Sequence, residues 1–182
     1  MSQTPVRLIP LVCVKCSSPV PANPDEVAWV CEQCGQGQIL DDAQPKGLAA
    51  LDVFFSRAMQ QGQRGRPFWV TRGTVTINTR ETYKGNEEQA ARAFWSAPRL
   101  FYIPAWDASL DETIAMGVQF LHNPARIEPG SPVPFLPVTT GPGDLRALAE
   151  FMVVSIEADR RDAMKTINFG LSLEPAQLWV LP

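Results

Sequence analysis

The strongest constraint in this chain is a pair of cysteine motifs near its start. Cys13 and Cys16 form one C-x2-C motif, Cys31 and Cys34 form a second, and 14 residues separate the two. Two such motifs supply the four thiolates of a tetrahedral structural Zn²⁺ site. Four sulfurs fill every position of a tetrahedral shell, so none is left for water or a substrate. The motifs therefore predict a metal ion that stabilises a fold and takes no part in a reaction.

The segment around these motifs resembles a zinc ribbon over about residues 11–40. A small residue follows each pair, Ser17 after the first and Gly35 after the second, which lets backbone N–H groups turn back toward the sulfurs. The apolar stretch 27–30 predicts a short strand that runs into the second pair. The resemblance implies that the four cysteines hold Zn²⁺ as a structural ion, although the spacer is one residue below the usual length of about 15 to 20. Beyond Leu40 the sequence resembles no family that we recognise.

Disulfide bonds and redox chemistry are the alternatives for the same cysteines. The apolar run 8–14 is short and is interrupted by Pro10, which argues against the core of a secretory signal. A redox C-x2-C motif is expected beside a β-α-β pattern, and no such unit surrounds these two pairs. We therefore expect reduced, metal-bound cysteines and a cytoplasmic location. No apolar run approaches the roughly 18 residues of a membrane span.

Length and patterning predict an α+β protein in two parts. A chain of 182 residues with 45% hydrophobic content can bury one sizeable core beside a small ribbon. We expect a zinc ribbon at residues 1–46 and an α+β domain at residues 47–182, joined by the polar segment 41–46. The domain is expected to hold an antiparallel or mixed sheet and about four helices. The expected helices are 48–59, 87–97, 109–123 and one beginning at 144, and the expected strands are 68–80, 99–106, 166–173 and 177–181.

Charge is unevenly distributed along the chain. The net charge is −2 over residues 1–47, +4 over residues 48–102 and −5 over residues 103–182. Four thiolates on one Zn²⁺ ion would make the first segment more acidic still. The positive segment supplies the candidate partner-binding residues, which are Arg64, Arg66, Arg72 and Arg80. Arginine predominates over lysine, which favours well-defined contacts with carboxylates and predicts an acidic protein partner.

These features favour a non-enzymatic adaptor or assembly subunit that mediates protein–protein contacts in a cytoplasmic complex. We identify no catalytic residues, because the single histidine, His122, falls at the end of an expected helix and the cysteines are assigned to the metal. The alternative is a nucleic-acid-binding or transcription-linked module that uses the arginine face, which an acidic ribbon disfavours. An enzyme whose site combines carboxylates and arginines is a third reading. The oligomeric state is not defined by the sequence.

Overall fold

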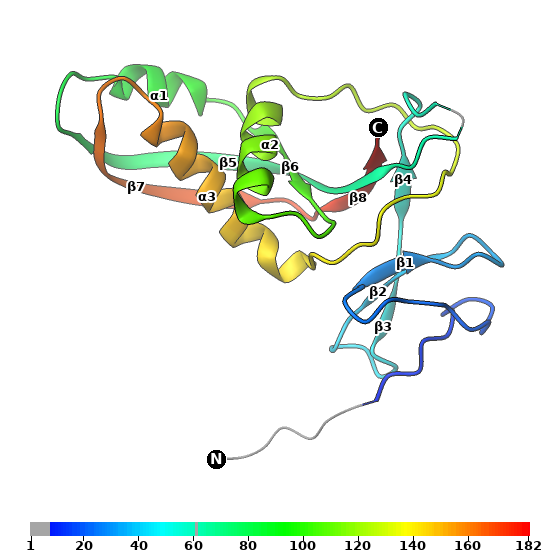
Figure 1. Cartoon of the computed structure of the whole chain (residues 1–182). Coiled ribbons are helices and arrows are strands. Elements are labelled where there is room, and N and C mark those ends of the chain that lie inside the picture. Colours follow the sequence, from blue (N-terminus) through cyan, green and yellow to red (C-terminus); the bar gives the residue numbers. More distant parts are fainter. Residues whose placement is uncertain (1–7, 61) are drawn as a thin grey trace, which may run out of the picture.

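The computed structural model describes residues 8–60 and 62–182 and shows a small antiparallel sheet beside a larger α+β body (Figure 1). The small sheet has the strand order β1-β2-β3 and contains β1 (Ala28–Val30), β2 (Gly37–Leu40) and β3 (Leu48–Leu51). Cys13 and Cys16 precede this sheet, and Cys31 and Cys34 lie between β1 and β2. The N-terminal module is thus compatible with the ribbon expected from the sequence. The first seven residues of the expected 1–46 unit lie outside the described part of the chain.

The larger sheet is mixed, as expected, and is organised around one long strand. Its strands are β4 (Val53–Phe55), β5 (Arg66–Thr82), β6 (Arg99–Pro104), β7 (Met164–Leu173) and β8 (Gln177–Leu181). The strand order is β4-β8-β5-β6, with β4 and β8 parallel and the other pairs antiparallel. Gly73 pairs with both Leu173 of β7 and Arg99 of β6, so β7 continues the β8 side of β5. The second half of β5 and β7 therefore form a two-stranded extension of the sheet.

Over residues 8–60 and 62–182, three α-helices accompany this sheet, one fewer than the expected four. They are α1 (Glu88–Phe94), α2 (Leu110–His122) and α3 (Leu145–Ala158), and a 3-10 turn, Pro142–Asp144, precedes α3. Apolar residues from all three helices join the inner face of the sheet in one core, which includes Ala91 of α1, Leu121 of α2 and Met152 of α3. The α+β class is therefore confirmed. No helix in the described part of the chain combines the length and the apolar character needed to cross a bilayer.

The helix expected at residues 48–59 is wrong. Residues 48–51 form β3, which pairs with β2, and residues 53–55 form β4, which pairs with β8. The apolar positions in this stretch repeat at helical spacing, but Val53, Phe54 and Phe55 have high strand propensity. Short apolar runs are ambiguous between helix and strand, and here pairing with β2 and β8 decides in favour of strands.

The ribbon shares its interior with the body and is not joined to it by a flexible linker. Ala28 of β1 and Ile39 of β2 belong to the same buried core as Trp69 of β5 and Leu178 of β8. The expected linker, residues 41–46, is instead the turn between β2 and β3, closed by a 2.9 Å hydrogen bond from Asp41 N to the Gly47 carbonyl. The expected boundary after residue 46 thus falls in this turn, and a single residue separates β3 from β4.

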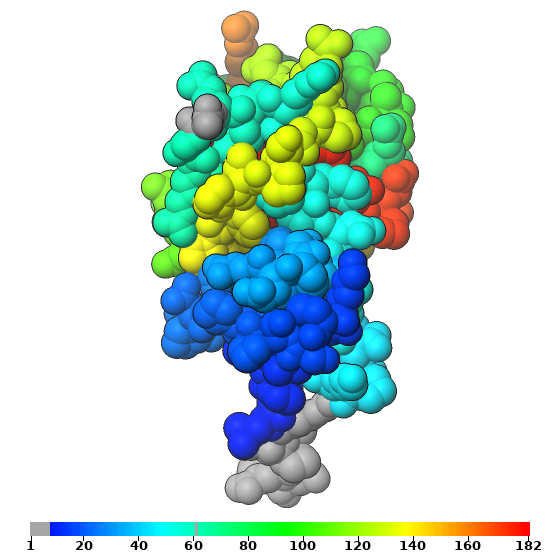
Figure 2. Space-filling view, turned by 90° about the vertical axis from the view of Figure 1, so that its right-hand side faces the viewer, coloured from blue at the N-terminus to red at the C-terminus, as the bar shows by residue number. Residues whose placement is uncertain are grey.

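The proline-rich segment 124–141, here called the strap, fastens the two parts together. It lies across the junction above the ribbon, where it is yellow in Figure 2. Its main chain forms isolated bridges to Ser56, Gly65 and Ala28 in turn. Val138 of the strap is fully buried and accepts a 2.8 Å hydrogen bond from Val27 N of the ribbon. The prolines therefore belong to a packed crossover and not to a free loop.

The strap provides a matched test of this packing. A Cβ atom added to Gly130 would lie 2.6 Å from Arg57 Cα and 2.7 Å from Arg57 N, and the backbone there has little room to move. We expect Gly130→Ala to lower the free energy of unfolding by about 1–3 kcal/mol, measured by urea denaturation. Gly141→Ala is the control, since a Cβ at this strap position meets nothing within 4 Å. Equal effects of the two substitutions would contradict the close fit at Gly130.

Candidate metal centre

Two backbone turns of the same design present the four cysteines. The first knuckle, residues 13–18, is closed by Ser17 N donating to the Cys13 carbonyl at 2.9 Å, and the second, residues 31–36, by Gly35 N donating to the Cys31 carbonyl at 2.8 Å. Ser17 and Gly35 have φ values of 61° and 71°, so both turns pass through the left-handed region at the residue after the second cysteine. The small residues expected at these two positions thus make the tight turns.

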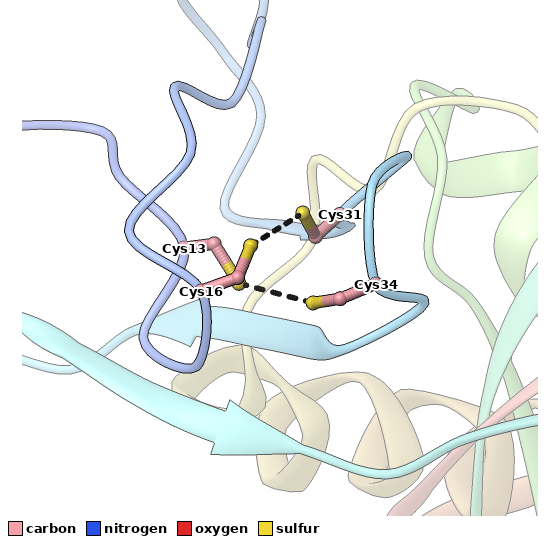
Figure 3. Close-up of side chains that lie close together, drawn as sticks. All are labelled: Cys13, Cys16, Cys31 and Cys34. Atoms are coloured by element: carbon pink, nitrogen blue, oxygen red, sulfur yellow. Dashed lines mark hydrogen bonds between the residues drawn. The ribbon is translucent and has the colours of Figure 1, made fainter.

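The four sulfurs converge on one point between the knuckles (Figure 3). All four Sγ atoms lie within 4.8 Å of one another. The two closest cross-knuckle pairs are Cys13–Cys34 at 3.5 Å and Cys16–Cys31 at 3.7 Å. A tetrahedral ion with metal–sulfur distances of about 2.3 Å places its sulfurs about 3.8 Å apart. The cluster therefore fits a single metal ion, and each knuckle contributes two of its four ligands.

Hydrogen bonds favour thiolate formation at the first knuckle. The Ser18 hydroxyl, whose Oγ lies 3.3 Å from Cys16 Sγ, and the Ser18 backbone N–H lower the pKa of Cys16 to about 6. The backbone N–H of Cys16 and then that of Lys15 lower the pKa of Cys13. Both effects stabilise the charged form of the sulfur, which is the form that binds a metal.

In the second knuckle, the structure disfavours the Cys34 thiolate. The backbone N–H of Gln36 favours the Cys34 thiolate, but burial and the neighbouring sulfurs outweigh it and raise the pKa of Cys34 to about 12. Burial is the larger cause, because it disfavours the charged form, and the neighbouring sulfurs add to this opposition. A cation held between the sulfurs would remove this opposition, so metal binding and complete ionisation of the cluster are coupled.

One supporting residue was missed by the sequence reasoning. Gln38 is fully buried in β2, and its Oε1 accepts a 2.9 Å hydrogen bond from Val14 N inside the first knuckle. This bond ties the first knuckle to the strand that follows the second. A polar residue in an otherwise apolar strand was the only signal for it in the sequence.

Comparisons with known proteins identify no relative. The chain matches no model of a protein family, no curated protein and no solved structure. The likeness to a zinc ribbon therefore rests on the two knuckles and their sulfur cluster alone.

The structure separates the four candidate arginines. Arg72 is exposed on the outer face of β5, and within the described residues its side chain has no ion-pair or hydrogen-bond partner. Arg64 and Arg66 are also exposed, but Arg64 donates to the Phe135 carbonyl at 3.2 Å and Arg66 donates twice to the Pro182 carbonyl at 3.0 and 2.7 Å. These three remain on the surface where a partner can reach them.

Arg80 was expected on the exposed face of this strand. That prediction is wrong, because the Arg80 side chain is completely buried. Simple alternation along β5 would place it beside Arg72, but the pairing with β7 shifts between Ile77 and Thr79. This bulge inserts Asn78 as an extra residue and reverses which face later side chains occupy. Arg80 consequently points inward, toward the helices.

Beneath the sheet, Arg80 organises a buried ionic network. Its guanidinium binds both oxygens of Asp162 and donates to Glu157 Oε2 at 3.0 Å. Trp95 Nε1 donates to the other Glu157 oxygen at 2.9 Å, and Glu87 N donates to Asp162 at 2.8 Å. The hydrogen bonds from Arg80 lower the pKa of Asp162 to about 2. Because the two carboxylates are paired on all sides, the network joins β5, α1 and α3 and has a structural role.

Proposed function

We propose that this protein is a non-enzymatic adaptor or assembly subunit whose ribbon holds a structural Zn²⁺ ion and whose surface mediates protein–protein contacts in a cytoplasmic complex. The observation that carries the proposal is the sulfur cluster, in which all four Sγ atoms lie within 4.8 Å. Four cysteine ligands are typical of structural zinc and leave no coordination position for chemistry. The ion would thus serve the shape of the molecule.

The way the ribbon is mounted supports a scaffolding role for the metal. Its inner face contributes Ala28 and Ile39 to the core of the body, and the strap bonds to its first strand. An ion that holds the knuckles together would also hold this inner face in place against the body. Ribbon, strap and body would then present one continuous surface to a partner.

Arg72 is the best candidate for the partner contact. It stands on the outer face of β5 in a row with Thr74, Thr76 and Asn78, all of which are exposed. An exposed guanidinium without an internal partner is free to form a bidentate contact with a carboxylate. We propose an acidic partner protein that binds this face, with Arg64 and Arg66 as further contacts.

Purification from the native cell tests the adaptor function. We expect a protein to co-purify in stoichiometric amount and to be lost when Arg72 is changed to Glu, because charge reversal repels an acidic surface. Arg161→Glu, which reverses an exposed arginine after α3, should leave capture intact. The absence of any stoichiometric partner, or capture that ignores Arg72→Glu, would contradict the proposal.

A salt titration separates the adaptor from the nucleic-acid-binding alternative. Phosphate contacts would give measurable affinity for DNA or RNA that falls steeply as salt rises. We expect no such binding at physiological salt, measured by fluorescence anisotropy with labelled oligonucleotides. Of the two arginines expected on the exposed face of β5, Arg72 is exposed but Arg80 is buried. Micromolar or tighter binding that disappears in Arg72→Ala would favour the alternative.

A further inference from the structure

A cavity of about 390 Å³ lies where the ribbon meets the body. One wall is the turn that precedes β1, and the other walls are the segment after β6 and the end of the strap. Its apolar lining comes from Trp106, Leu136 and Pro137. All three side chains are partly buried, so the cavity has firm apolar walls and an accessible mouth.

The charge around this cavity has one sign. Asp25, Glu26 and Asp107 contribute to its lining, and none of the lining residues is basic. Glu26 accepts hydrogen bonds from Asn23, at 2.8 Å from the backbone nitrogen and 3.2 Å from the side chain, which fixes its carboxylate. Within the described residues, Asp25 and Asp107 form no ion pair. The site therefore combines three carboxylates with an indole and lacks a cation.

Among the described residues, one cation lies over the same indole, and it does not supply positive charge to the cavity. The Arg66 guanidinium lies 5.9 Å from the Trp106 ring centroid, but it donates to the Pro182 carbonyl and is not part of the cavity lining. Its position shows that the Trp106 ring is accessible to a guanidinium. The cavity lining itself contains carboxylates and no guanidinium or ammonium group.

We propose that this cavity binds a basic side chain, arginine or lysine, from an extended segment of a partner protein. The face of an indole attracts cations, and the carboxylates at the rim select positive charge over a neutral side chain of similar shape. The inference rests on the proposed adaptor function, and it adds a second contact whose charge is opposite to that of the Arg72 face.

A neighbouring cavity indicates that the occupant is a stretch of chain. This second cavity, also about 390 Å³, shares four lining residues with the first, which are Asn23, Glu26, Leu136 and Pro137. It continues between β1 and the strap toward Trp29 and Phe135. Figure 2 shows the lower end of the yellow strap against the ribbon on this side of the molecule. The two cavities together give a groove whose acidic end is the first cavity. Glu32 and Arg64 also line the second cavity, where the Arg64 guanidinium donates to the Phe135 carbonyl at 3.2 Å. Such a groove suits an extended peptide that places a basic side chain at the acidic end.

Small cationic probes test the acidic end of the groove without knowledge of the partner. Nα-acetyl-arginine amide and Nα-acetyl-lysine amide are titrated into the full chain, and Nα-acetyl-citrulline amide serves as the neutral equivalent of arginine. The readout is the indole N–H signal of Trp106 in a ¹⁵N–¹H correlation spectrum, assigned with Trp106→Phe. We expect a saturable shift with at least one cationic probe and affinity for citrulline at least tenfold weaker.

The second part of the test removes negative charge from the rim of the cavity. The double variant Asp25→Asn plus Asp107→Asn should weaken binding of the cationic probe at least tenfold, because the indole alone selects charge weakly. Asp42→Asn removes one carboxylate from the β2–β3 turn of the same ribbon, outside the cavity, and should leave the affinity unchanged.

Three results would overturn the inference: no shift with either cation, an equal shift with citrulline, or full binding by the double variant. If the probes bind as expected and no partner co-purifies, the adaptor function fails and cation binding at the cavity stands. If a partner co-purifies and the probes do not bind, the cavity proposal alone fails.

Discussion

Arg80→Ala is expected to lower the free energy of unfolding by roughly 3–5 kcal/mol, because it leaves the buried Asp162 without its cation and removes one of the two cations paired with the buried Glu157, which keeps Arg160 at 2.8 Å. Asp162 and Glu157 are both fully or almost fully buried, and Arg80 binds both of them. The control is Arg72→Ala in the same strand, whose side chain is exposed and should change stability by no more than about 0.5 kcal/mol. Urea denaturation of the two variants measures the difference. Similar stabilities for both would contradict the inward orientation that the bulge at Asn78 produces.

Acid provides an independent readout of the same network. The pKa of Asp162 is lowered to about 2 in the folded protein, so its contribution to stability is complete above the ordinary carboxyl range near pH 4. The contribution is lost as pH falls from about 4 toward 2, because the unfolded chain takes up the proton first. The stability difference between the parent protein and Arg80→Ala should therefore shrink over this interval. A difference that stays constant down to pH 2 would contradict the ion pair.

Loss of the proposed Zn²⁺ ion is expected to be the other severe perturbation. The purified protein should contain one zinc per chain, and Cys31→Ser should abolish stoichiometric binding, because Cys31 is one of the four converging sulfurs. Metal affinity that assembles a ribbon is folding free energy, of the order of 10 kcal/mol for small zinc modules. We therefore expect the ribbon to unfold in Cys31→Ser.

The body should respond as well, since the ribbon and body share one core. Helical circular dichroism should persist in Cys31→Ser at low temperature, and the midpoint of thermal unfolding should fall. Ala50→Ser, an exposed change in β3 of the same ribbon, is the control and should keep both zinc and stability. Less than about half an equivalent of zinc in the reduced parent protein would remove the metal assignment. An unchanged midpoint in Cys31→Ser would show that the ribbon does not support the body.

Local signals account for the parts of the fold and site that could be predicted from the sequence. The spacing of Cys13, Cys16, Cys31 and Cys34 is enough to predict that the four sulfurs converge, since each knuckle is a local turn. The helix start at Ser109 and Glu112 was equally readable, and the two residues form a reciprocal capping box in the structure. In each case the residues that decide the structure lie within a few positions of one another.

The incorrect predictions all concern residues whose structure depends on partners distant in the sequence. Residues 48–55 have helical spacing, and only the edges of β2 and β8 turn them into strands. Arg80 has the sequence context of a solvent-facing strand residue, and only its register against β7 reveals the extra residue before it. Asp162 is far from Arg80 in sequence and gave no sign of becoming its counter-ion. Pairing across the sheet therefore decides the features that local periodicity leaves ambiguous.

The order in which the chain is made gives the shared core a biological consequence. The four cysteines span residues 13–34, so a nascent chain contains all of them before the strands of the larger sheet are made. The inner face of the ribbon, at Ala28 and Ile39, shares its core with Val138 of the strap and Leu178 of β8, which are made much later than the ribbon. During translation the ribbon therefore exposes an apolar face until β8 has been made. Over that interval the nascent ribbon is a natural target for chaperones, and chains truncated before β8 should be prone to aggregate through this face.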